Sequence, residues 1–278
     1  MALELRIEED KLPVFSAVAT KALNLLKEDN AINKLIQDVI REDPALTERV
    51  LGIANSPFYG QVAATSISTA VTRLGIRQLR KVILTAATGQ LFDSDDVYVK
   101  GLWRHALMTA MTANIIADSL HPEMAESAYV AGLLHDVGKL VIYSQHQEPY
   151  REAIDEAKEK GLRLHQVETA KFKFFDHMSV GGLAARKWGL DDSIAEAARF
   201  HHAIEEELPS VVGHSKLVSL ASLASILANN MGYGQPFCEF DAMLDFFCVE
   251  HLSLTADRLD QLAEKVQDKL KDQEEGGG

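Results

Sequence analysis

Ala131-Gly132-Leu133-Leu134-His135-Asp136-Val137-Gly138-Lys139 is the stretch of this chain that decides its fold. It places a histidine and an aspartate side by side in an apolar run that continues a helical pattern, and we expect one helix over residues 125–140. A buried carboxylate is costly unless it is paired with a cation or bound to a metal. We therefore expect the fold to bring partners for His135 and Asp136 from other helices.

Histidines on other predicted helices are the candidate partners of this pair. Neutral imidazole nitrogen and carboxylate oxygen suit first-row divalent metals such as Fe, Mn, Ni or Zn. Helices of a bundle can each bring one or two such side chains to one point, which builds a metal site in the bundle core. The candidate ligands, for one or two ions, are His105, His135, Asp136, His177, His201 and His202.

The two oxygens of Asp136 would allow it to bridge two ions. Two metals about 4 Å apart polarise a phosphate and generate a hydroxide nucleophile in many phosphohydrolases. Adjacent residues of a helix point about 100° apart, so His201 and His202 are not expected to ligate one ion equally. The expected ligand sets are His105 and His135 for one ion, and His177 with His201 or His202 for the other.

Lys139 and the remaining histidines have less specific surroundings. Lys139 either reaches a bound phosphate group of a ligand or is a solvated lysine beyond a helix end. The remaining histidines lie in polar or loop sequence and are expected on the surface; they are His121, His146, His165, His214 and His251.

Apolar residues recur at spacings of three and four along most of the chain, and this predicts an all-α protein. Gly161–Leu164 is expected to form a turn, and 167–175 is mixed and aromatic-rich. Residues 148–160 are expected to form a polar, solvated helix. The other predicted helices cover 13–28, 32–40, 44–54, 66–74, 76–86, 102–117, 177–188, 192–202, 217–231 and 255–271.

Composition and charge limit the classes of function. The chain has 278 residues, of which 47% are hydrophobic, so it can bury a full core. Its net charge of −13 disfavours general binding to nucleic acid, whose phosphates are also negative. The sequence contains no run of 18 apolar residues, so no membrane span is expected. Two cysteines and the lack of an apolar signal core favour a cytoplasmic protein.

The acidic segment Asp93–Asp96 is a plausible boundary between two helical halves. We expect an N-terminal helical half at 12–92, a second half with the candidate metal site at 97–234, and a C-terminal helical extension with a flexible tail at 235–278. The helix over 255–271 either packs on the body or pairs with a second chain, so a homo-oligomer stays open.

Short motifs outside the candidate site form a further pattern. They are Leu12-Pro13, Ile40 to Leu46, Ala54 to Gly60, Ala70 to Gly75, Leu133 to Lys139, His177 to Ala184, Trp188 to Leu190 and His201-His202. In these motifs residues 12–234 resemble the HDOD domain, the HD-related output domain of bacterial signalling. That domain lies within the superfamily of HD metal-dependent phosphohydrolases.

The resemblance implies an all-helical fold with an HD-like second half and an output role in bacterial signal transduction. Many HDOD members lack some HD ligands and are regarded as non-enzymatic. This chain keeps six candidate ligands, but Ser222 stands where the HD enzymes carry an aspartate. The glycine-tyrosine-proline signature of the cyclic-dinucleotide phosphodiesterases is also absent after His201-His202.

Three functions therefore remain open. The first is a non-catalytic output module that binds a signalling protein partner or a small nucleotide-like ligand, with a possible divalent-metal site. The second is a metal-dependent phosphohydrolase or phosphodiesterase acting on a nucleotide. The third is a plain helical scaffold in which the histidines only pack the core.

Overall fold

The computed structural model of this protein describes residues 3–14, 43–56, 63–202, 215–234 and 247–275. The regular elements in these ranges are helices, with one isolated bridge between Leu3 and Phe172, so the all-α prediction is confirmed. The predicted helices over 13–28 and 32–40 fall almost wholly outside the described residues. The chain divides into two compact units, Met1–Pro13 with Phe92–Ala263 and Val14–Leu91 with Glu264–Gly278.

The second unit contains α3 (Pro44–Ala54) and α4 (Ile67–Gly89), which pack against each other. Asp43 starts α3, because its side chain accepts a hydrogen bond from the Leu46 N–H at 2.9 Å and Pro44 occupies the first turn. Gly75 interrupts α4 as expected, since its φ of +73° lies in the left-handed region that favours glycine.

Asn55 closes the connection between these two helices. Its side-chain amide donates to the Ala64 carbonyl oxygen at 3.0 Å, and its side-chain oxygen accepts from the Ala64 N–H at 2.6 Å. The asparagine of the Ala-Asn-Ser motif is therefore a structural residue that satisfies two backbone groups at once.

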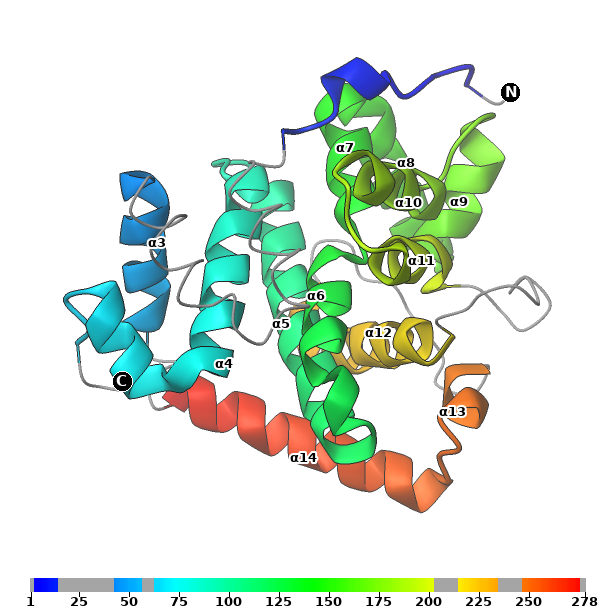
Figure 1. Ribbon diagram of the computed structural model, residues 1–278. Helices are drawn as coiled ribbons and strands as arrows, with labels where there is room; N and C mark the ends of the chain where they lie inside the picture. Colours follow the sequence, from blue (N-terminus) through cyan, green and yellow to red (C-terminus); the bar gives the residue numbers. More distant parts are fainter. Residues whose placement is uncertain (1–2, 15–42, 57–62, 203–214, 235–246, 276–278) are drawn as a thin grey trace. The chain divides into compact units, whose positions relative to one another are not determined.

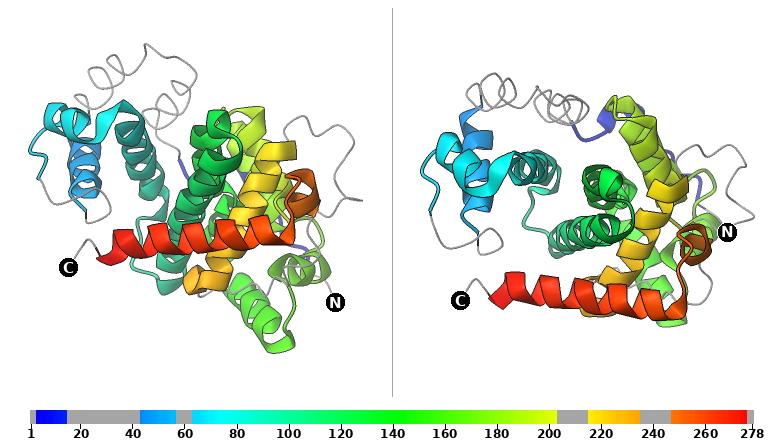
Figure 2. Two further views of the ribbon diagram at one scale, coloured as in Figure 1. Left: turned by 90° about the horizontal axis from the view of Figure 1, so that it is seen from below. Right: turned by 60° about the horizontal axis from the view of Figure 1, so that its bottom comes forward.

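The first unit begins with a short 3₁₀ turn, η1 (Glu9–Lys11), and continues with α5 to α13 (Figure 1). Among the described helices, α5 packs on α6 and α12, and α10 packs on α7 and α11 (Figure 2). The helices are α5 (Val97–Leu120), α6 (Ala125–Leu134), α7 (Val137–Gln145), α8 (Gln147–Lys160), α9 (Leu164–Lys171), α10 (His177–Lys187), α11 (Asp192–Phe200), α12 (Ser215–Ala228) and α13 (Phe247–His251).

Small residues let α5 and α6 approach each other closely. A Cβ atom on Gly132 of α6 would lie 2.9 Å from the Ala110 Cα atom of α5, which is closer than real contacts allow. Ala106 and Ala110 of α5 pack there with Tyr129 and Leu133 of α6. The alanine-rich sequence of α5 thus serves the tight helix packing that brings His105 near His135.

The prediction of one helix over residues 125–140 is wrong, although Gly138, where the sequence favours a helix break or a close approach of backbones, does lie at such an approach. The helix ends at Leu134, and α7 starts at Val137, with Asp136 at φ −98° and ψ 10° between them. The break lets α7 leave in a new direction and meet α10, where a Cβ atom on Gly138 would overlap the His177 carbonyl oxygen. The turn thereby places the buried Asp136 side chain in contact with residues of several helices instead of one.

The segment after α8 also differs from the expectation. Gly161, at φ +62°, ends α8, and α9 starts at Leu164, where a turn and mixed structure were predicted. The Arg163 N–H donates to the Gln166 side chain at 3.2 Å and so caps the new helix. Moreover, α8 is not wholly solvated, because Tyr150, Ile154 and two alanines on one of its faces are buried.

The last helix, α14 (Ala256–Glu275), carries the predicted amphipathic stripe, with Leu259, Leu262, Val266 and Leu270 buried. Among the described helices, none combines the length and the apolar composition that a membrane crossing requires.

Candidate metal centre

Asp136 lies at the point where the candidate ligands meet. Its Oδ2 atom lies 3.3 Å from His135 Nε2 and 3.6 Å from His105 Nε2. Its Oδ1 atom lies 3.3 Å from His201 Nε2 and 3.6 Å from His177 Nε2. The two carboxylate oxygens therefore face two different groups of imidazoles, which come from α5, α10 and the ends of α6 and α11.

Hydrogen bonds on the outer ring nitrogens hold three of the imidazoles in place. His135 Nδ1 donates to the Gly132 carbonyl oxygen at 2.8 Å, and His201 Nδ1 donates to the Ala198 carbonyl oxygen at 2.9 Å. His177 Nδ1 bonds to Glu168 Oε2 at 2.6 Å. Because Nδ1 carries the proton in these bonds, each Nε2 lone pair is left to act as an acceptor or a ligand.

Several inward-facing atoms of the centre have no hydrogen bond to any residue that the structure describes. The Nε2 atoms of His135, His177 and His201 and the Oδ1 atom of Asp136 are buried, and within the described residues none of them has a hydrogen-bond partner. Buried polar atoms are normally satisfied, so a group of such atoms at one point requires a cause. A bound cation would supply the missing partner of each such atom that it contacts.

Two sets of donors converge closely enough to hold an ion. One set is His105, His135 and Asp136, and the other is Asp136, His177, His201 and His202; within each set the ligand atoms lie within 4.8 Å of one another. The structure thus brings the six predicted ligands together. Nitrogen-rich sets with one carboxylate suit Zn²⁺, Fe²⁺, Mn²⁺ or Ni²⁺ rather than Ca²⁺ or Mg²⁺, which prefer oxygen.

The charges at the centre are set by burial and by near neighbours. Burial of His201 lowers its pKa to about 4, so this imidazole is neutral at physiological pH and its lone pair can ligate. Burial alone would raise the pKa of Asp136, but the neighbouring His135 and Lys139 side chains hold it well below its usual range. Burial also opposes protonation of His177, yet the Glu168 carboxylate raises its pKa.

Glu168 is a site residue that the sequence reasoning missed. It is 0% exposed and accepts hydrogen bonds from His177 Nδ1, from the His177 backbone N–H at 3.0 Å and from the Tyr150 hydroxyl at 2.5 Å. A carboxylate behind a ligating histidine fixes its ring and makes it a stronger donor. No sequence signal marked Glu168, because it lies in the segment where no helix was predicted.

We expect Glu168→Gln to weaken binding of a divalent transition metal by roughly 10–100-fold, because the His177 ring loses its anionic partner. The amide can still accept a bond from His177 Nδ1, so the fold should persist. Calorimetric titration with Zn²⁺ measures the change in affinity. Tyr150→Phe is the matched control, since it leaves the carboxylate on His177 and should have a smaller effect; equal affinities of the Glu168→Gln variant and the wild type would contradict this role.

Two serines of α12, Ser222 and Ser225, form hydrogen bonds with candidate ligands. Ser222, which the family resemblance places at the position of an aspartate in the HD enzymes, donates its hydroxyl proton to the His201 carbonyl oxygen. Ser225 Oγ lies 3.2 Å from His105 Nε2 and shares a hydrogen bond with it. The His105 side of the centre therefore has the Ser225 hydroxyl as a hydrogen-bond partner.

Lys139 is buried, so the interpretation of this residue as a solvated lysine beyond a helix end is wrong. It is only 2% exposed, and its Nζ atom donates to Asp136 Oδ2 at 2.9 Å. It lies three residues after Asp136 in the first turn of α7, which brings the ammonium group back over the carboxylate.

Three histidines expected on the surface are half-buried instead. His165 stacks on His202 with ring centres 5.1 Å apart, and His146 stacks on Phe175 at 5.9 Å. His251 is exposed as expected, His121 is half-buried beside Glu123, and His214 lies outside the described residues. His165 therefore supports the ring of the candidate ligand His202. The polar sequence around His165 gave no indication of this contact.

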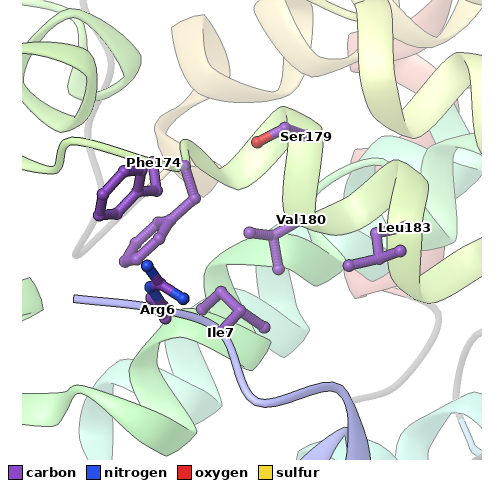
Figure 3. A pocket seen from close by; sticks show the side chains of 7 residues that line it. Arg6, Ile7, Phe174, Ser179, Val180 and Leu183 are labelled. Carbon is purple, nitrogen blue, oxygen red and sulfur yellow. The ribbon is translucent and has the colours of Figure 1, made fainter. Parts of the chain in front are cut away.

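A separate cavity of about 380 Å³ lies between the N-terminal segment and the start of α10 (Figure 3). Its walls are mainly apolar, and the Arg6 guanidinium lies 5.4 Å from the centre of the half-exposed Phe174 ring. None of the candidate metal ligands lines it. The lining residues are Arg6, Ile7, Phe174, Phe175, Ser179, Val180 and Leu183.

An all-helical fold with a histidine-aspartate pair at the centre of converging helices defines a protein of the HD type. Within that class the chain belongs to the HDOD domain family, whose model matches residues 12–204. The family resemblance inferred from the motifs is thereby confirmed.

Solved structures with the same fold come from several bacteria. An HDOD domain protein of unknown function from Geobacter sulfurreducens is 25% identical, with a TM-score of 0.80 over 96% of this chain and 93% of that chain. A proposed phosphohydrolase from Shewanella amazonensis is 24% identical, with a TM-score of 0.72 over 96% and 94%. A proposed signal transduction protein from Marinobacter aquaeolei is 24% identical, with a TM-score of 0.76 over 99% and 61%.

A curated relative is longer than this chain. It is an uncharacterized protein of Treponema pallidum (strain Nichols), 27% identical over 216 residues. The match covers 76% of this chain but only 41% of that relative. The chain therefore spans less than half of the length of this relative, whose name states no activity.

Proposed function

We propose that this chain is a signal-transduction output domain that binds a divalent transition metal and acts through a protein partner or a small nucleotide-like ligand, without catalysis. The single observation that carries the metal is the group of buried, unsatisfied Nε2 and Oδ1 atoms around Asp136. Membership of the HDOD family supports the output role.

The surroundings of the centre favour a binding role over hydrolysis. His135, His177 and Asp136 have side chains no more than 4% exposed, which leaves little room for a phosphate group beside an ion. Ser222 supplies a hydroxyl where a catalytic carboxylate would be needed, and that hydroxyl is engaged by the His201 backbone. An ion held in this way would fix the relative positions of α6, α7, α10 and α11, on which a partner surface could be built.

A small ligand of the proposed kind could bind in the cavity beside Arg6. A ring of the ligand could stack on Phe174, which is 50% exposed, and a negatively charged group could lie against the Arg6 guanidinium. This cavity is separate from the metal centre, so a ligand there would not need to be a substrate.

The alternative is a metal-dependent phosphohydrolase acting on a nucleotide. The observation that favours it is the retention of all six candidate ligands around one carboxylate, which could support two-metal chemistry. The likeness to the Shewanella amazonensis structure shows the fold and does not decide between the two functions.

We expect purified full-length protein to contain a transition metal by elemental analysis and to lose it in the Asp136→Asn variant. In a panel of nucleotides with Mn²⁺ or Fe²⁺ added, we expect turnover no higher than that of the same variant. No metal after loading with a several-fold excess would exclude the proposed metal role. Hydrolysis that disappears in the Asp136→Asn variant would instead establish the phosphohydrolase.

A further inference from the structure

We infer that the centre holds one divalent ion, on the Oδ1 side of Asp136, because the Lys139 ammonium group occupies the second cation's place at Oδ2. This inference rests on the proposed metal-binding function and goes beyond it in assigning number and position. It follows from the different surroundings of the two carboxylate oxygens.

The Oδ2 atom already has a cation. Lys139 Nζ lies 2.9 Å from it, closer than any imidazole nitrogen. Lys139 is buried, and a buried ammonium group requires a counter-ion, which here is Asp136. A divalent ion at Oδ2 would have to displace this ammonium or lie directly beside it, and repulsion between like charges opposes both in a buried site.

One of the two imidazoles on the Oδ2 side, that of His105, is also less available. His105 Nε2 lies 3.2 Å from Ser225 Oγ, nearer than its 3.6 Å to Asp136. From α12, Ser225 faces this region with a hydroxyl group and brings no carboxylate. An ion there would have two imidazoles and an oxygen already shared with Lys139.

The Oδ1 side has the opposite character. Oδ1 and the Nε2 atoms of His177 and His201 are buried and lack a hydrogen-bond partner among the described residues. His202 brings a further nitrogen to the same group, so one oxygen and three nitrogens converge. Four such donors match the tetrahedral preference of Zn²⁺ and also suit Fe²⁺.

Glu168 adds to this asymmetry. It places a second buried carboxylate behind His177, on the Oδ1 side, whereas the outer nitrogens of His135 and His201 bond to neutral backbone carbonyls. With Lys139 present, Asp136 and Glu168 can balance much of the charge of one divalent ion but not of two. The charges of this chain therefore match a single ion.

The test is the number of ions per chain, measured by calorimetric titration with Zn²⁺ and by elemental analysis on the full-length protein. We expect one equivalent in the wild type and two in Lys139→Met, which keeps the side-chain volume and removes the charge. Lys160→Met, which removes an exposed lysine of α8, should still bind one equivalent and controls for the change in net charge. Two equivalents in the wild type, or one in Lys139→Met, would overturn the inference.

A second measurement tests the position of the ion without altering Lys139. We expect His177→Gln to weaken Zn²⁺ binding at least tenfold more than His105→Gln, because His177 faces the Oδ1 atom of Asp136 whereas His105 faces Oδ2. Equal losses would contradict the assignment. If the wild type binds no metal after loading, the proposed metal function itself fails, which is distinct from a wild type that binds two ions.

Discussion

Asp136→Ala is expected to abolish metal binding and to lower the free energy of unfolding by about 3–5 kcal/mol, the usual cost of breaking a buried ion pair. The large effect arises because Lys139, which is 2% exposed, would lose its counter-ion without gaining access to water. Chemical denaturation and elemental analysis measure the two effects separately. An unchanged metal content together with an unchanged stability would refute the shared role of Asp136.

The double variant Asp136→Asn with Lys139→Met separates the ion pair from the metal. It leaves no charge on either residue, so much of the lost stability should return, as is found when buried ion pairs are replaced as a whole. Metal binding should remain absent, because the shared carboxylate is still missing. A double variant as unstable as Asp136→Ala would mean that Asp136 stabilises the fold by something other than Lys139.

Gly138→Ala is expected to destabilise the first unit by at least the roughly 1–3 kcal/mol that overpacking costs. The added Cβ atom would overlap the His177 carbonyl oxygen, and the Gly181 backbone lies close behind it. Since these are backbone atoms, no rotation of a side chain can relieve the overlap, and α7 must move away from α10. That movement would also separate Asp136 from His177, so we expect loss of metal together with a lower melting temperature.

Gly52→Ala in α3 is the matched control for this substitution. A Cβ atom there would meet nothing within 4 Å, so the change should be neutral or stabilise the helix by up to about 1 kcal/mol. If Gly138→Ala behaved like Gly52→Ala, the close contact between α7 and α10 would be absent in solution.

Much of the fold and of the candidate site followed from local sequence patterns. The 3.6-residue period of apolar side chains predicted helices near α5, α10, α11 and α12, because a helix buries one face whatever its neighbours are. The break at Gly75 followed from the conformational freedom of glycine. The six candidate ligands could be chosen because buried histidine and aspartate require partners.

Long-range contacts decided what the sequence left open. The helix over 125–140 breaks at Asp136 because α7 must meet α10 at Gly138, and that contact lies some 40 residues further along the chain. Likewise, no local pattern joins Glu168 and Tyr150 to His177, or His165 to His202.

The chemistry of the candidate ligands was therefore a property of the sequence by itself, because side-chain type determines which atoms can bind a metal. The arrangement of those ligands was not. Only the tertiary structure placed one group of imidazoles, together with Lys139, at Oδ2 of Asp136 and the other group at Oδ1, since these positions depend on the packing of α5, α6, α7, α10 and α11.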